Sequence, residues 1–183
     1  IEQGRNFCNK LWNVCRFRLL SGDLVDNSSM GKITWRINSK QIGEYDQAIL
    51  LRLIETYEDI DKLYEEYEFN EVLKNIYRFF WNDFCDWYVE NSKPRMADEA
   101  LKGTCLAVQD ICLRQILLLL HPFTPFITEE LWNLLGFSTG SSIQFEDPGT
   151  AEDLIEKLGS GGIELDNSIL VETNLIRELV TAM

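Results

Sequence analysis

Residues 76–88 read IYRFFWNDFCDWY, and this stretch says most about the fold of the chain. Seven of its thirteen residues are aromatic. On a helix these side chains nearly encircle the axis, so the pattern predicts a helix that is central and largely buried. The few polar positions of this helix recur at i, i+3, i+7 and i+11, and therefore share one face: Asn75, Arg78, Asn82 and Asp86.

Apolar residues recur with the period of a helix on both sides of this stretch. The pattern predicts helices over residues 6–20, from Glu44 to about 68, from Asp98 to Leu120, and from Thr124 to about Leu135. Thr124-Pro125 suits an N-cap followed by a first helical residue, and Gly136 suits the position after a helix end. In the aromatic helix, Asn70 is the expected N-cap and Pro94 the expected stop after Lys93.

Two segments lack this period. Residues 21–43 are rich in Ser, Gly, Asn and Asp and are predicted to form a loop, with a short extended stretch at 33–37. Residues 137–183 contain Gly and Ser clusters, possible short strands near Ile143 and 169–171, and the start of a helix at Thr173. The predicted fold class is therefore all-α. An antiparallel bundle of four to five long helices fills residues 1–136, and a small irregular appendage follows at 137–183.

Composition narrows the possible functions of this 183-residue chain. Hydrophobic residues make up 45%, which is typical of a globular protein, and no apolar run approaches the ~20 residues of a membrane span. The net charge of −13 opposes nucleic-acid binding in general. The charge is uneven, however: residues 1–40 hold seven basic and three acidic residues, whereas residues 122–183 hold two and eleven. One less acidic edge could still bind RNA.

The five cysteines are odd in number and form no C-x-x-C pair. Cys8 and Cys15, like Cys105 and Cys112, lie seven residues apart among apolar neighbours, which predicts buried, reduced thiols and a reducing, cytoplasmic location. The single histidine, His121, is predicted to be a structural residue at a helix end. With no cysteines clustered around it, no metal site is expected.

Several blocks resemble the anticodon-binding bundle of class I aminoacyl-tRNA synthetases, and the valyl family most closely. They are GRNFCNKLWN at 4–13, FNE at 69–71, FWNDFCDWY at 80–88 followed by SKPR at 92–95, and LHPFTPFITEELW at 120–132. The blocks occur in the right order and cover residues 1 to about 136. The tail resembles the family only weakly, at Ser142-Ile143 and at Ile176 to Val180.

This resemblance implies a recognition arm of a larger enzyme that attaches valine to tRNA using ATP and magnesium. The family activates its amino acid with a His-Ile-Gly-His type motif and a Lys-Met-Ser-Lys-Ser type loop, and neither is present here. The chain is therefore expected to be non-catalytic alone and to hold no cofactor. The implied partners are valine-accepting tRNA and the catalytic domain of the same polypeptide. No membrane is expected as a partner, and the chain is expected to be a monomer.

The candidate tRNA-binding residues follow from this resemblance and from side-chain chemistry. Amides can both donate to and accept from base edges, and guanidinium groups pair with phosphate or stack on bases. The candidates are Asn6, Asn9, Asn13 and Arg16 on one face of the first helix, Asn82, and Lys93 and Arg95 where the third helix ends. An ordinary solvated face, or a cation at a helix C-terminus, would give the same pattern.

Other polar and aromatic residues are expected to serve the fold. Asp83 and Asp86 should form polar ties within the bundle, because a carboxylate that faces RNA is costly. Trp12, Trp81, Trp87 and Trp132 are predicted to be core residues. Three alternative functions remain: the same domain of an isoleucyl, leucyl or methionyl synthetase, a helical scaffold for protein partners, or a carboxylate-bridged metal enzyme. The last lacks the Glu-x-x-His motif that it would need.

Overall fold

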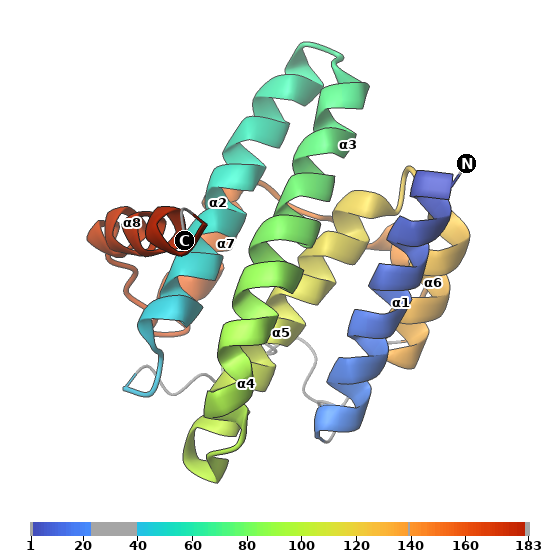
Figure 1. The fold of residues 1–183 in the computed structure, drawn as a ribbon. Coiled ribbons are helices and arrows are strands. Elements are labelled where there is room, and N and C mark those ends of the chain that lie inside the picture. The colour runs from blue at the N-terminus through green and yellow to red at the C-terminus, as the bar shows by residue number, and fades with distance from the viewer. Residues whose placement is uncertain (1, 23–39, 139, 182–183) are drawn as a thin grey trace.

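The computed structural model describes residues 2–22, 40–138 and 140–181, and within these ranges every regular element is a helix. In chain order the elements are α1 (Glu2–Ser21), α2 (Glu44–Glu65), α3 (Phe69–Arg78), η2 (Phe79–Val89), α4 (Glu90–Met96), α5 (Glu99–Leu120), α6 (Pro125–Leu134), η3 (Ile143–Phe145), α7 (Ala151–Ser160) and α8 (Ser168–Thr181). The prediction of an all-α bundle is confirmed (Figure 1). The extended stretch expected at 33–37 lies outside the described residues.

The aromatic stretch lies in one continuous rod made of α3, η2 and α4 (Figure 1). Its middle part, η2, is a π-helix, in which each N–H bonds to the carbonyl five residues earlier. Phe79, Phe80, Phe84 and Tyr88 are buried, so the prediction of a central aromatic helix is confirmed. The α2–α3 hairpin runs antiparallel, and its turn contains Tyr67 with a φ of 60°.

Both predicted ends of this rod were wrong. The rod begins at Phe69, and Glu68, rather than Asn70, is its N-cap, with the carbonyl of Glu68 accepting from the amides of residues 71 and 72. Pro94 also does not end it, because the helix continues to Met96. The amides of residues 97 and 98 bond to the carbonyls three residues back, those of Pro94 and Arg95. This 3₁₀-type pattern, rather than Pro94, ends the helix.

Helix α5 forms the centre of the core, and fifteen of its 22 residues are buried. By length and hydropathy α5 could cross a membrane, but its apolar 18-residue window is 83% buried among the neighbouring helices, as expected of a core helix. Asp98 caps its start by accepting a hydrogen bond from the amide of Ala100 at 2.9 Å. Burial of each large apolar side chain of this helix contributes about 1.5–3 kcal/mol to the free energy of unfolding.

Helix α6 begins and ends as the sequence predicted. Thr124 is its N-cap, Pro125 is its first residue, and Gly136 follows its end with a φ of 70°. The amide of Gly136 bonds to the carbonyl of Asn133, and the amide of Phe137 bonds to that of Trp132. These two bonds and the edge-to-face contact of the Phe137 and Trp132 rings form a Schellman motif.

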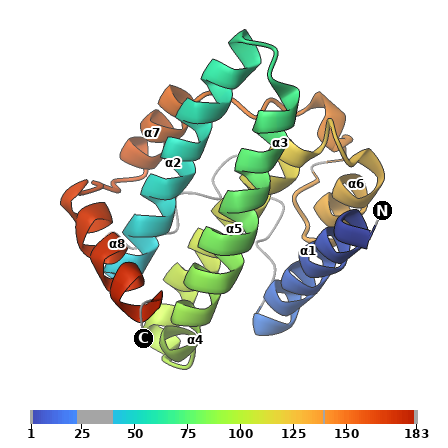
Figure 2. The ribbon, with the colours of Figure 1, turned by 45° about the horizontal axis from the view of Figure 1, so that its top comes forward.

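The tail is more regular than the predicted irregular appendage. It contains α7 and α8, which pack against α2 (Figure 2). The strands expected near Ile143 and at 169–171 are wrong, because the first lies in a short 3₁₀ turn and the second in α8. Ile143, Leu154, Leu158 and other tail residues belong to the same hydrophobic cluster as the bundle. A domain boundary after residue 136 stays a prediction, and the core continues across it.

Candidate nucleic-acid interface

Helix α1 presents the predicted polar stripe to solvent. Asn6, Asn9, Asn13 and Arg16 are all exposed. The opposite face of α1 buries Phe7, Leu11, Cys15 and Arg18 against the bundle. The alternation of apolar and polar residues along the helix therefore fixes which face is offered to a partner.

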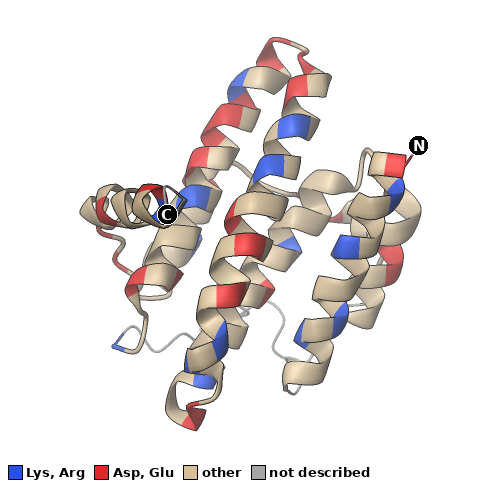
Figure 3. Cartoon of the chain, viewed as in Figure 1, with Lys and Arg blue, Asp and Glu red and all other residues tan. Residues whose placement is uncertain are grey.

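The charge of α1 differs from that of the rest of the molecule (Figure 3). Its residues 2–21 include four basic side chains and one acidic one. In α2, seven acidic residues stand against two basic ones. A phosphate backbone would therefore meet the least repulsion along α1.

The side of α1 that faces η2 is held by ring and charge contacts. Lys10 Nζ lies 2.6 Å from Asp86 Oδ1 and 3.9 Å from the centre of the Trp81 ring. The Phe7 ring packs edge to face on Phe80. The predicted role of Asp86 as a tie within the bundle is confirmed. Its partner Lys10, which also lies over the Trp81 ring, is not among the candidate residues that the sequence predicted.

A buried ion pair also fixes α1 to the core. Arg18 Nε and Nη2 each lie 2.7 Å from one carboxylate oxygen of Asp110 on α5, and both side chains are almost fully buried. Such a two-bond fork holds its partners in one orientation. It therefore sets the rotation of α1 about its axis, which keeps the polar stripe facing outward.

The two candidates on α4 have different surroundings. Lys93 is exposed, bonds to the Glu90 carboxylate at 2.6 Å, and lies 6.0 Å from the Phe17 ring of α1, next to the polar stripe. Arg95 instead points inward. Its guanidinium donates to the fully buried carboxylate of Asp46 and to the carbonyl of Gln41. The structure thus places Lys93 near the stripe, whereas the guanidinium of Arg95 is hydrogen-bonded within the fold.

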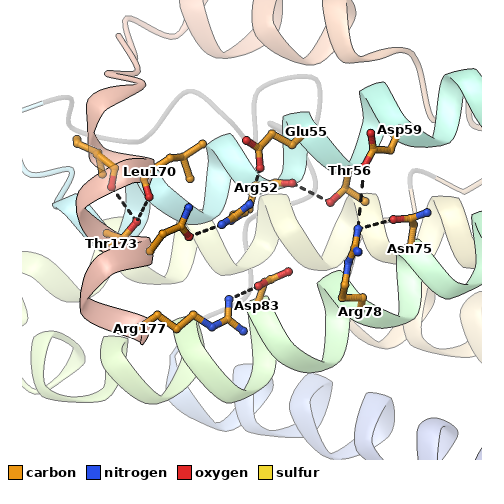
Figure 4. Close-up of polar contacts among 12 residues, drawn as sticks. Arg52, Glu55, Thr56, Asp59, Asn75, Arg78, Asp83, Leu170, Thr173 and Arg177 are labelled. Carbon is orange, nitrogen blue, oxygen red and sulfur yellow. Dashed lines mark hydrogen bonds and ion pairs between the residues drawn. The ribbon is translucent and has the colours of Figure 1, made fainter. Parts of the chain in front are cut away.

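Asn82 lies on the other side of the rod, in a groove of about 600 Å³ between α2, the rod and α8 (Figure 4). Three arginines line this groove together with four carboxylates. Arg177 of α8 is paired with Asp83, which confirms the predicted internal role of that acid, and it also donates to the carbonyl of Asn82 at 3.1 Å. Arg52 bonds to Glu55 at 2.7 Å. Asn82 is therefore not brought together with the α1 stripe.

One predicted core residue is exposed. Trp132 is fully buried, and Trp81 and Trp87 are half-buried, but Trp12 keeps 42% of its surface exposed. The prediction of a core role is wrong for Trp12. Its position at the edge of the apolar stripe, next to the amide stripe, was the available signal.

The remaining polar groups support the structural roles that were predicted for them. His121 Nδ1 lies 2.8 Å from the Thr128 hydroxyl. All five cysteines are free, and four are buried. Burial raises the pKa of Cys85 to about 12 and that of Cys105 to about 11. In the part of the chain that the structure describes, no three His, Cys, Asp or Glu side chains are grouped to hold a metal ion.

Comparison with known proteins identifies the class. Residues 46–182 match the family described as the anticodon-binding domain of tRNA ligase, so the chain belongs to this family. The match begins at Asp46, after the end of α1.

Valine–tRNA ligases are among the similar proteins. The chain is 40% identical over 157 residues to that of Staphylococcus haemolyticus and 38% identical over 172 residues to that of Halalkalibacterium halodurans. These alignments cover 85% and 93% of the chain. They cover only 17% and 19% of the respective ligases, so the chain spans less than a fifth of their length.

Proposed function

We propose that this chain recognises the anticodon loop of valine-accepting tRNA, as the recognition part of a ligase that joins valine to tRNA with ATP and magnesium. The observation that carries the proposal is α1, an exposed amide and guanidinium face with a basic excess on an otherwise acidic molecule of the anticodon-binding family. Proteins read single-stranded RNA loops by bonding to exposed base edges and by stacking on bases. Asn6, Asn9, Asn13 and Arg16 supply the first kind of contact, and Lys93 extends the surface.

Two candidates contribute less to this surface. Arg95 would act through the fold, because its guanidinium is already bonded to Asp46. Asn82 would contact RNA only if the loop also reached the groove between α2 and α8. Proteins named valine–tRNA ligase among the relatives favour valine over isoleucine, leucine or methionine as the amino acid. Free cysteines buried in the core support a reducing, cytoplasmic location.

The proposal is tested by binding. A stem-loop RNA that carries a valine anticodon should bind the chain more tightly than the same stem-loop with a changed anticodon, in a filter-binding titration at moderate salt. Asn13→Ala should weaken binding of the first RNA by about 5- to 30-fold, since each base-edge contact that is lost costs roughly 1–2 kcal/mol. Equal retention of both RNAs would refute anticodon recognition.

The chain alone should catalyse no valine-dependent pyrophosphate exchange, because the motifs for amino-acid activation are absent from its sequence. Exchange by the pure protein would show that it is an enzyme without its expected partner domain.

A further inference from the structure

Trp12 is a large flat side chain that the fold leaves partly exposed to solvent. It is 42% exposed on α1, and within the described residues no other ring packs on its indole and no cation lies over it. By contrast, Trp81 stacks on Tyr77 and carries Lys10 over its ring, and Trp132 is packed by Phe137 and Arg114. The Trp12 ring therefore differs from these two in having a surface available for a flat ligand.

The neighbours of Trp12 on the helix are polar. Asn9 precedes it by three residues and Arg16 follows it by four, and these spacings place side chains next to each other on a helix surface. Both side chains are exposed. An indole ring, an amide and a guanidinium thus form one surface about two helical turns long. The buried Arg18–Asp110 pair, which fixes the rotation of α1, also fixes the direction of this surface.

Among biological ligands, an unpaired nucleobase fits this combination well. Stacking on the indole buries the apolar face of the base. The amide can bond to the edge of the base, and the guanidinium can bond to the adjacent phosphate. A paired base in a duplex hides both of its faces, so duplex RNA would gain nothing from the indole.

We propose that Trp12 is the base-stacking residue of this interface, receiving one unpaired base of the RNA loop between Asn9 and Arg16. The proposal rests on the proposed function, because it names the contact through which that RNA would be held. A protein segment packed on Trp12 is the competing occupant, and the experiment below separates the two.

The experiment is a fluorescence-anisotropy titration of the labelled valine-anticodon stem-loop with the 183-residue chain and its variants. Trp12→Ala should weaken binding about 5- to 150-fold, as expected for the loss of one base–aromatic stack. Trp12→Phe should restore part of the affinity and Trp12→Leu should not, because only the first keeps a flat ring. Phe145→Ala is the matched control, since it removes an aromatic side chain that is 77% exposed on η3, and it should bind like the wild type.

Two further measurements sharpen the result. Bound RNA should quench tryptophan fluorescence of the wild type more than that of Trp12→Phe, and the duplex stem without its loop should not compete. If the wild type binds the RNA and Trp12→Ala binds it equally well, this inference is wrong while the proposed function stands. If the wild type does not bind the RNA, both are wrong. Urea unfolding checks that every Trp12 variant is folded under the binding conditions, and Trp12→Phe, which keeps a ring against the covered side, should unfold closest to the wild type.

Discussion

Asp46 shows how one buried charge can be held both by the backbone just before its own helix and by a distant element of the chain. Its carboxylate has no exposed surface and accepts hydrogen bonds from the amide of Gly43 at 2.9 Å, from the hydroxyl of Tyr88 at 2.8 Å and from Arg95. Burial, followed by the charge of Asp46, raises the pKa of Tyr88 well above its ordinary range, so this hydroxyl remains a donor. The carboxylate therefore joins the start of α2 to the rod.

We expect Arg95→Ala to destabilise the fold rather than to remove a contact with RNA. The change leaves a buried carboxylate without its cation, and the free energy of unfolding should fall by about 2–3 kcal/mol, since two neutral donors remain. Urea unfolding followed by circular dichroism measures this. Lys93→Ala is the control, and it should change the free energy of unfolding by less than about 0.5 kcal/mol, because its ion pair with Glu90 is exposed. A stable Arg95→Ala variant that no longer binds RNA would contradict the structural role.

At the scale of elements, α8 is held mainly by polar contacts. Arg177 reaches the rod at Asp83, and Asn174 accepts from Arg52 of α2 (Figure 4). Its outward face leaves apolar side chains exposed, among them Val171, Leu175 and Leu179. With little apolar burial, α8 should open more readily than the bundle.

Removing the Arg177 side chain should therefore loosen α8 selectively. In Arg177→Ala, hydrogen exchange of the amides in residues 168–181 should accelerate at least several-fold, while amides of α5 keep the protection of the wild type. Arg78→Ala is the matched control, because it removes an arginine of the same groove that does not touch α8. Equal acceleration in α5 would mean that α8 opens only when the whole protein unfolds.

Local sequence signals predicted the helices that they could describe. Periodicity gave α1, α2, the aromatic rod, α5 and α6, and the Thr-Pro and Gly signals gave both ends of α6. Helix α7 also had a signal that was overlooked. Thr150 and Asp153 form a reciprocal capping box, a spacing visible in the sequence before the apolar pair Leu154 and Leu158. The π-helical hydrogen bonding of η2 had no such signal, because apolar periodicity predicts a helix without specifying bonds to the fifth rather than the fourth residue back.

The candidate site likewise contains some residues that the sequence could predict and others that it could not. The four residues of the α1 stripe were predictable because they recur on one helix, so the burial of its opposite face exposes them. The commitment of Arg95 was not predictable, since its partner Asp46 lies 49 residues away in the sequence and no local pattern joins the two. The position of Trp12 at the edge of the apolar stripe signals that its side chain could be exposed, but periodicity leaves such an edge residue undecided, because its exposure depends on where α5 and α6 lie beside α1.

At the scale of the whole molecule, the buried thiols should make stability fall in alkaline solution. The pKa of Cys85 rises from about 9 to about 12 on burial, and burial also raises the pKa values of Cys15 and Cys112. Between pH 9 and 11 the unfolded chain therefore loses thiol protons that the folded chain keeps. Each such thiol lowers the free energy of unfolding by up to about 1.4 kcal/mol per pH unit.

Urea unfolding at pH 8, 9, 10 and 10.5 measures this effect. The midpoint should be nearly constant up to pH 8.5 and fall above it. Cys85→Ala should reduce the slope above pH 9, because it removes one of the thiols whose pKa burial raises. A midpoint that stays constant to pH 10.5 would contradict the burial of the four thiols.

The uneven charge shown in Figure 3 affects how this protein would meet an RNA molecule in solution. A basic excess on α1 and acidic excesses on α2 and in the tail separate opposite charge across the molecule, which gives it an electric dipole moment. The field of an approaching polyanion exerts a torque on this dipole that turns α1 toward the polyanion before contact, although the net charge of −13 opposes the approach itself. Salt would screen both effects, so ionic strength would change the fraction of collisions that arrive in the productive orientation as well as their number.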